Sequence, residues 1–238
     1  MQYAFINGAS RGLGRALVEV LLQGGYSVFA GVLKSEVNLL ADVQKVSGDK
    51  LMVLEMDVTK EDDVKNAAVE VSRRTNALHL AVNNAGVLYG SAENPDNPMD
   101  IDMAQLAESM DVNVYGGMRV LKHFFPLMKQ AAKESNPTVI NVTSEAGSVI
   151  NAAPCYDPYC ISKTAMNMVS NKMKLLLHPH GIRVFAVHPG RMKTDMSAGN
   201  GEITPGESAA GILKIVENTI HVSDDEKFID YLGQTMTL

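Results

Sequence analysis

The side chains best suited to acid–base chemistry in this sequence are a tyrosine and a lysine four positions apart. Tyr159 precedes Lys163, and residues at positions i and i+4 share one face of a helix, so both side chains can reach one ligand. A free phenol has a pKa of about 10, and a neighbouring ammonium favours its ionised form. The pair therefore predicts a group that gives and takes a proton. The alternative is an ordinary surface pair, because this spacing is common on amphipathic helices.

A glycine-rich loop follows the first apolar run of the chain. The run is Tyr3-Ala4-Phe5-Ile6, and the loop is Asn7-Gly8-Ala9-Ser10-Arg11-Gly12-Leu13-Gly14. Glycines let the backbone turn tightly and approach a pyrophosphate, and the dipole of the helix that follows favours negative charge there. The spacing differs from the common Gly-x-Gly-x-x-Gly, so the loop by itself also fits simple turn chemistry. Found with the Tyr159 and Lys163 pair, it predicts a dinucleotide site.

The elements that must position these residues follow from the hydrophobic pattern. Short apolar runs alternate with stretches of helical period, as in a parallel sheet covered by helices on both faces. The predicted fold class is therefore α/β, a single-domain, Rossmann-like, doubly wound parallel sheet. Strands are expected at 3–7, 27–33, 51–56, 78–83, 138–143, 183–188 and 228–231.

Helices are expected between these strands. The first starts where the glycines of the loop end and stops at Gly24-Gly25, and two long helices are expected near 104–128 and 158–177, the former after a surface loop at 87–103. Two polar segments predict capped helix starts. They are Thr59-Lys60-Glu61-Asp62 and Thr204-Pro205-Gly206-Glu207.

Composition bounds the class of protein. A chain of 238 residues with 46% apolar content is enough for one domain, expected to span 1–238. The net charge of −6 argues against a nucleic-acid or membrane surface. Cys155 and Cys160 fit neither a metal site nor a disulfide framework and are expected to be free thiols. Because no apolar run could span a bilayer and the N-terminus is strand-like, we expect a cytoplasmic protein.

The chain resembles the single-domain branch of the short-chain dehydrogenase/reductase family, and within it the Sniffer-type carbonyl reductases. The narrower resemblance rests on the segment from Pro189 to Met196, the short stretch after it, and Phe228-Ile229-Asp230-Tyr231. It implies an NAD(P)H-dependent oxidoreductase that interconverts a carbonyl and an alcohol. The family motifs occur in family order over nearly the whole chain: the glycine loop, Asp57-Val58, Asn83-Asn84-Ala85-Gly86, Asn113, Ser144, Tyr159, Lys163 and Pro189-Gly190 with Thr194.

The resemblance also implies roles for single residues. Tyr159 would exchange a proton with the substrate oxygen, which Ser144 would orient, while Lys163 and the oxidised nicotinamide favour the phenolate. Asn113 would anchor a water that links Lys163 to solvent, although it could also be a polar helix residue. The residues expected to bind the cofactor are Gly8, Ser10, Arg11, Gly12, Leu13, Gly14, Lys34, Asp57, Val58, Asn84, Ala85, Gly86, Tyr159, Lys163, Pro189, Gly190, Met192 and Thr194.

Two departures from the family pattern concern the site. Asn7 stands where the family usually has threonine, and its short polar side chain can make a similar hydrogen bond. Tyr156 is nearer than Tyr159 to the usual separation from Ser144, but Cys160 rather than a lysine follows it by four. We therefore interpret Tyr156 as a wall of the substrate pocket. The loop from Gly147 to Pro158 is then about two residues longer than is usual in the family.

Cofactor choice depends on the residues after the second strand, where a carboxylate binds ribose hydroxyls and repels a 2′-phosphate. Val32 occupies the usual acid position, whereas Arg11 and Lys34 could pair with the phosphate. NADP(H) is therefore favoured. Glu36, expected in the next helix or turn, and the possibility that both cations are solvated keep NAD(H) as the alternative.

The substrate side is expected to be apolar and partly open beneath a short lid near 191–206. Its walls would be Val149, Cys155, Tyr156 and Met196, which suit small hydrophobic aldehydes or ketones. By family analogy the two long helices pair copies of the chain into a homodimer or homotetramer. Two other classes remain open: a non-catalytic dinucleotide sensor, and a lyase or epimerase that uses the cofactor internally.

Overall fold

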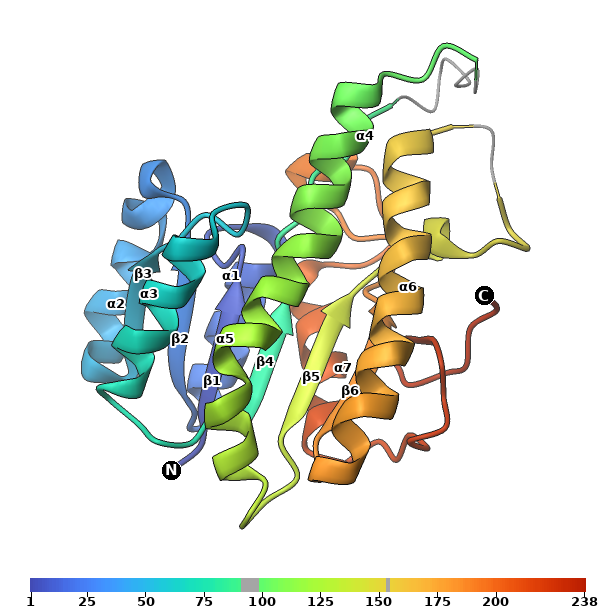
Figure 1. Cartoon of the computed structure of the whole chain (residues 1–238). Coiled ribbons are helices and arrows are strands. Elements are labelled where there is room, and N and C mark those ends of the chain that lie inside the picture. The colour runs from blue at the N-terminus through green and yellow to red at the C-terminus, as the bar shows by residue number, and fades with distance from the viewer. Residues whose placement is uncertain (91–98, 153–154) are drawn as a thin grey trace.

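The fold is built on one parallel sheet of seven strands. The computed structural model describes residues 1–90, 99–152 and 155–238, so 91–98 of the expected surface loop and 153–154 of the long loop lie outside the described residues. The strand order is β3-β2-β1-β4-β5-β6-β7 (Figure 1). Every strand expected from the sequence is present, with its ends within two residues of the prediction. The strands are β1 (Tyr3–Asn7), β2 (Ser27–Val32), β3 (Leu51–Glu55), β4 (Leu80–Asn83), β5 (Thr138–Val142), β6 (Arg183–His188) and β7 (Ile229–Asp230).

Helices cover both faces of the sheet (Figure 1). Alternate residues of a strand point to opposite faces, so Ala4 and Ile6 of β1 join one core and Phe5 joins the other. The first core is closed by α1 and α7, and the second by α3, α5 and α6. The predicted fold class is therefore confirmed. The helices are α1 (Gly12–Gln23), α2 (Ala41–Ser47), α3 (Glu61–Ser72), α4 (Met103–Met110), α5 (Gly116–Ala131), α6 (Asp157–Leu177) and α7 (Pro205–Val216).

The first long helix is not continuous, which corrects the sequence-based prediction. A π-helical turn, η3 (Asp111–Tyr115), separates α4 from α5. The side chain of Asn113, in the middle of this turn, is bonded to the backbone of Val87. The spacing of hydrophobic residues along the sequence cannot reveal this turn, because the turn is associated with hydrogen bonds to a segment 26 positions away.

The predicted helix starts had mixed outcomes. The predicted capped start of α7 is confirmed as a capping box, a reciprocal pair of hydrogen bonds. Thr204 Oγ1 accepts from the Glu207 N–H at 3.2 Å, and Glu207 Oε2 accepts from the Thr204 N–H at 2.7 Å. The cap at α3 was wrong: Lys60 precedes the helix, and the Thr59 hydroxyl donates to Asp57 Oδ1 at 2.7 Å. In the described part of the chain, no helix is long and apolar enough to cross a membrane.

Candidate active site

The glycine loop is tightly packed where β1 passes into α1. Gly8 and Gly12 have φ values of +62° and +53°, which favour glycine. A Cβ on Gly8 would lie 2.7 Å from Ala85 Cα, and one on Gly14 would lie 2.1 Å from the carbonyl oxygen of Gly8. Only glycine at position 14 leaves room for this close approach. The helix α1 begins at Gly12, inside the loop, and not after the glycines as predicted.

The start of α1 offers donors to an anion. Arg11 at the N-cap makes no side-chain capping bond with any described residue, and the first turn carries no acidic side chain. Beside Gly12 there is room, because an added Cβ would meet only the methyl group of Thr194, at 3.7 Å. Free N–H groups at the positive end of a helix, beside an open glycine face, fit a pyrophosphate. Leu13 is buried in the core behind them.

Asn7 joins this loop to the segment that follows β4. Its Oδ1 accepts hydrogen bonds from the N–H groups of Asn84, at 2.9 Å, and Ala85, at 2.6 Å. The Asn84 amide in turn donates to the carbonyl of Gly8 at 2.8 Å. The departure from threonine therefore keeps the hydrogen bonding and adds an amide group. Gly86 lies beyond, where an added Cβ would be 3.8 Å from Lys163 Nζ.

Acidic side chains border the far end of the candidate cofactor site. Glu36 lies in the 3-10 helix η1 (Lys34–Leu40), as anticipated, but it faces the glycine loop. Its carboxylate accepts from Ser10 Oγ at 2.7 Å and lies 3.7 Å from Arg11 Nη2. Lys34 lies 3.8 Å from a carboxylate oxygen of Glu55. Both cations expected to meet a 2′-phosphate therefore have a carboxylate partner.

Asp57 and Val58 follow β3 at the same edge of the sheet. Burial disfavours the charge on Asp57, but hydrogen bonds from the N–H and hydroxyl of Thr59 hold the pKa of the carboxyl below its ordinary value. Val58 is buried against α5, where a Cβ on Gly116 would lie 2.9 Å from it. Asp57, one of the residues expected to bind the cofactor, is thus an ionised acceptor.

Ser144 and Tyr159 meet at the carboxyl edge of the sheet. Ser144 follows β5, and Tyr159 lies in the first turn of α6. Burial raises the pKa of Tyr159 to about 12, although the side chain of Ser144 lowers it in part. This corrects the expectation of a lowered phenol pKa. The physical reason is the burial of the phenol. Lys163 Nζ donates to the carbonyl of Val142 at 2.9 Å and lies 5.4 Å from the tyrosine ring centroid.

Lys163 is itself buried, which lowers its pKa to about 8. Asn113 is close by and fully engaged. Its Nδ2 donates to the Val87 carbonyl at 3.0 Å and to Ser162 Oγ at 2.9 Å, and its Oδ1 accepts from the Val87 N–H at 2.8 Å. Ser162 then donates to the Tyr159 carbonyl at 2.7 Å. Sequence reasoning missed Ser162, although it stands directly before Lys163.

The expected substrate walls are partly exposed. Val149 is 67% exposed and Met196 50%, while Cys155 and Tyr156 are half-buried at the start of α6. Tyr156 adopts φ +58° and directly precedes α6, whereas Tyr159 is the tyrosine whose pKa is lowered in part by Ser144. Neither Cys155 nor Cys160 forms a disulfide bond with a described residue, as predicted, and Cys160 Sγ donates to the Cys155 carbonyl at 3.3 Å.

The short lid is closed on itself by its backbone. The Lys193 N–H donates to the Ile203 carbonyl at 2.9 Å, and the Ile203 N–H to the Arg191 carbonyl at 3.2 Å. The Arg191 side chain bonds Glu145, with nitrogen–oxygen distances of 2.6 and 3.2 Å. Pro189 is buried at the base of the lid, while Gly190, with φ +82°, packs against Ile203, and Met192 is half-buried. Sequence reasoning missed the ion pair between Arg191 and Glu145, because these residues are 46 positions apart.

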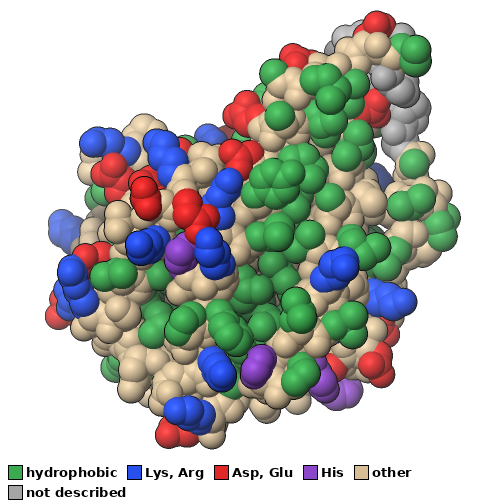
Figure 2. Space-filling model, in the orientation of Figure 1, with side chains coloured by type: hydrophobic (Ala, Val, Ile, Leu, Met, Phe, Trp, Pro, Cys, Tyr) green, Lys and Arg blue, Asp and Glu red, His purple; other side chains and the backbone are tan. Residues whose placement is uncertain are grey.

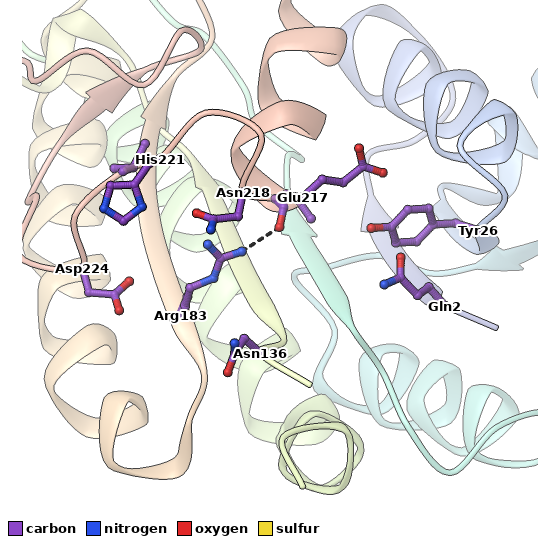
Figure 3. A pocket seen from close by; sticks show the side chains of 10 residues that line it. Gln2, Tyr26, Asn136, Arg183, Glu217, Asn218, His221 and Asp224 are labelled. Atoms are coloured by element: carbon purple, nitrogen blue, oxygen red, sulfur yellow. Dashed lines mark hydrogen bonds between the residues drawn. The ribbon is translucent and has the colours of Figure 1, made fainter. Parts of the chain in front are cut away.

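A cavity of about 480 Å³ lies at the opposite edge of the sheet (Figure 3). Arg183 crosses it and donates to the Val216 carbonyl at 2.6 Å and to Thr138 Oγ1 at 2.9 Å. This cavity is remote from the glycine loop, and its arginine is bonded within the fold. Among the described residues no cluster of three or more metal-binding side chains occurs.

Comparison with known proteins agrees with this geometry. The family model described as short chain dehydrogenase matches residues 2–203. Mouse estradiol 17-beta-dehydrogenase 2 is 32% identical over 194 residues, covering 81% of this chain and 48% of that protein. Short chain dehydrogenase pigC of Monascus ruber is 33% identical over 240 residues, covering 96% and 75%. The chain therefore spans about half the length of the mouse relative.

Solved structures share the whole fold. The NADPH-bound carbonyl reductase from chicken fatty liver has a TM-score of 0.88 at 27% identity, covering 100% of this chain and 99% of that one. The carbonyl reductase Sniffer of D. melanogaster has a TM-score of 0.90 at 24% identity, with 100% of both chains covered, and this likeness is one of fold. The resemblance to the family is thus confirmed. The chain belongs to the short-chain dehydrogenase family.

Proposed function

We propose that this protein is a nicotinamide-dependent oxidoreductase that interconverts a carbonyl and an alcohol. The observation that carries the proposal is the placement of Ser144 directly after β5 and of Tyr159 and Lys163 one turn apart on α6, at the same edge of the sheet as the glycine loop that opens α1. Ligands of open α/β sheets bind at this carboxyl edge. The glycine face and the donors of α1 would hold the pyrophosphate.

The side chains support chemistry in the reducing direction. A nicotinamide cofactor, when bound, would supply the hydride that the carbonyl carbon accepts. Ser144 holds the carbonyl oxygen, and the Tyr159 hydroxyl donates its proton to that oxygen, which yields the alcohol and a phenolate. A phenol with a pKa of about 12 keeps this proton at neutral pH. Lys163, with a pKa of about 8, is mostly an ammonium at pH 7 and stabilises the phenolate.

Small hydrophobic aldehydes or ketones are the proposed substrates. Support comes from the apolar side chains at the open mouth, Val149 and Met196. Arg191 in the lid is paired with Glu145 and so does not offer a free charge to an anionic substrate.

For the cofactor, we propose a preference for NAD(H) over the NADP(H) favoured by sequence. The support is Glu36, which holds Ser10 and approaches Arg11 beside the glycine loop. A carboxylate in this position accepts from ribose hydroxyls and repels a 2′-phosphate. Lys34 favours the opposite choice, NADP(H), because its side chain is 85% exposed and could still reach a 2′-phosphate.

A homodimer through α5 and α6 is also proposed. Apolar side chains gather over these helices (Figure 2), and contiguous exposed apolar surface of this kind marks interfaces. The exposed large apolar side chains on these two helices are Met118, Ile161, Met168, Leu175 and Leu176. Leu175→Glu is expected to give a monomer by light scattering, whereas Val46→Glu, at an 89% exposed site on α2, should not. An unchanged dimer in Leu175→Glu would exclude this face.

Tyr159→Phe tests the reaction. We expect oxidation of NADH and NADPH across a panel of aldehydes, ketones and diketones by the wild type, and loss of at least 1,000-fold, on the order of a general acid–base contribution, in the variant. Cofactor affinity, measured by fluorescence titration, should change less than about threefold, since the ring is retained. Retained turnover would refute the role of Tyr159. Cofactor binding without turnover by the wild type would favour the sensor.

A further inference from the structure

Three asparagine side chains form a continuous row across the interior of the sheet. Asn7, Asn83 and Asn141 are the cross-strand partners of β1, β4 and β5. Asn7 Nδ2 donates to Asn83 Oδ1 at 2.9 Å, and Asn83 Nδ2 donates to Asn141 Oδ1 at 2.7 Å. All three side chains are buried, with exposed fractions of 1%, 7% and 0%.

One end of the row lies in the wall of the candidate cofactor site, and the other end lies on the helix that carries Tyr159. At one end, Asn7 Oδ1 accepts from the N–H groups of Asn84 and Ala85, in the wall of the cofactor site. At the other end, Asn141 Nδ2 donates to Ser170 Oγ at 3.0 Å, and Ser170 donates to the Met166 carbonyl at 2.6 Å. Ser170 and Met166 belong to α6, the helix that carries Tyr159 and Lys163.

Every hydrogen bond in the row runs in the same direction. Each asparagine accepts on its oxygen and donates from its nitrogen, from the backbone N–H of Ala85 to the backbone carbonyl of Met166. Bonds aligned in this way polarise one another, and an interrupted buried row leaves a costly unpaired group. Displacement of one member is therefore felt by the others.

The row, together with Lys163, also fixes α6 against β5. Lys163 Nζ bonds the Val142 carbonyl at 2.9 Å, and two turns further along α6 the Ser170 hydroxyl receives the amide of Asn141, the neighbour of Val142. Two contacts with adjacent residues of one strand restrict both sliding and rotation of the helix. Rotation of α6 would move Tyr159 relative to Ser144.

We propose that Asn7, Asn83, Asn141 and Ser170 are positioning residues that couple the cofactor loop to the catalytic helix. This amide row transmits the placement of the glycine loop and the segment after β4 to α6, and so sets the distance between the bound cofactor and Tyr159. The inference rests on the proposed function for its kinetic readout. Threonine at position 7 would keep an acceptor for Asn84 and Ala85 but lacks the amide that donates to Asn83.

A double-mutant cycle between the two ends of the row tests the coupling. Asn7 and Asn141 are about 10 Å apart, from strand spacing, and Ser170 lies beyond Asn141, so Asn7→Thr and Ser170→Ala would act independently unless the row connects them. The matched control is Ser208→Ala, because Ser208 is fully buried in α7 and its hydroxyl has no partner in the described part of the chain.

The expected result is a split between kcat and binding. Ser170→Ala should lower kcat about tenfold with the KM of substrate and the Kd of NADH within threefold, whereas Ser208→Ala should leave all three unchanged. In the double variant, the loss of kcat should differ from the product of the single losses by threefold or more, and the cycle with Ser208→Ala should be additive. Equal effects of Ser170→Ala and Ser208→Ala, or additivity in both cycles, would overturn the proposal.

The same cycle can be measured on the Kd of NADH by fluorescence. If the wild type binds NADH without turnover, the proposed function fails, but the row is still tested. Non-additive changes in Kd for Asn7→Thr with Ser170→Ala would support coupling, and additive changes would refute it. The two failures are therefore distinguishable.

Discussion

Replacing Glu36 with glutamine is expected to move the cofactor preference toward NADPH. The amide has the shape of the carboxylate and still accepts from Ser10, whose Oγ lies 2.7 Å from Glu36 Oε2. The substitution removes one negative charge and releases Arg11, whose Nη2 lies 3.7 Å from Oε1. Both changes favour a ligand with a 2′-phosphate.

The magnitude follows from the environment of the carboxylate. Two unit charges about 4 Å apart interact by about 1 kcal/mol in water and about 4 kcal/mol at an effective dielectric constant of about 20. The side chain of Glu36 is 18% exposed, so we take about 2 kcal/mol for the relieved repulsion. This corresponds to a shift of about 30-fold in the ratio of kcat/KM for NADPH to that for NADH.

The assay is steady-state kinetics with both cofactors at one fixed carbonyl concentration and low salt. Asp42→Asn is the matched control, because it removes a carboxylate that is 66% exposed and paired with Arg15 on the neighbouring helix. Its ratio should stay within twofold of the wild type. A ratio in Glu36→Gln that also stays within twofold would show that Glu36 does not face the ribose, and the preference for NAD(H) would be withdrawn.

Two further predictions concern stability. Burial lowers the pKa of Lys163 from 10.5 to about 8, so below pH 8 the folded state holds a disfavoured ammonium. Lys163→Met should then raise the free energy of unfolding at pH 7 by up to about 3 kcal/mol. This gain should shrink between pH 8 and 10.5, because in that range the lysine of the wild type is protonated only in the unfolded state and the wild type becomes more stable as the pH rises. Denaturant titrations at pH 7 and 10 test this, and no gain in stability at pH 7 would refute it. Thr204→Ala should cost about 1 kcal/mol and lower Tm by about 2–4 °C, since it removes the cap of α7, and unchanged calorimetric traces would contradict the capping role.

Much of the fold could be predicted because its signals are local. Strand period and the stops at Gly24-Gly25 act over a few residues, and so does the box from Thr204 to Glu207. The candidate catalytic pair was predictable for the same reason, since Tyr159 and Lys163 lie one helical turn apart.

The parts that failed depend on contacts between distant segments. The π-helical turn at Asn113 follows from bonds to Val87, 26 positions away. The raised pKa of Tyr159 follows from burial, which composition cannot assign to one phenol. The direction in which Glu36 points depends on how the 3-10 helix after β2 folds back onto Ser10. The spacing of apolar residues along the sequence carries no information on the π-helical turn, the burial of Tyr159 or the orientation of Glu36.

The self-contained lid has a consequence for protein engineering. Its two ends are joined by a backbone hydrogen bond between Lys193 and Ile203, and none of the residues at 195–200 between them belongs to either hydrophobic core. The tip at 195–200 is therefore a candidate graft site, provided that Ser197 is kept, because its hydroxyl accepts from the Thr194 N–H at 3.0 Å and donates to the Met192 carbonyl at 2.8 Å. A library confined to this tip would alter the range of accepted carbonyl compounds separately from the chemistry.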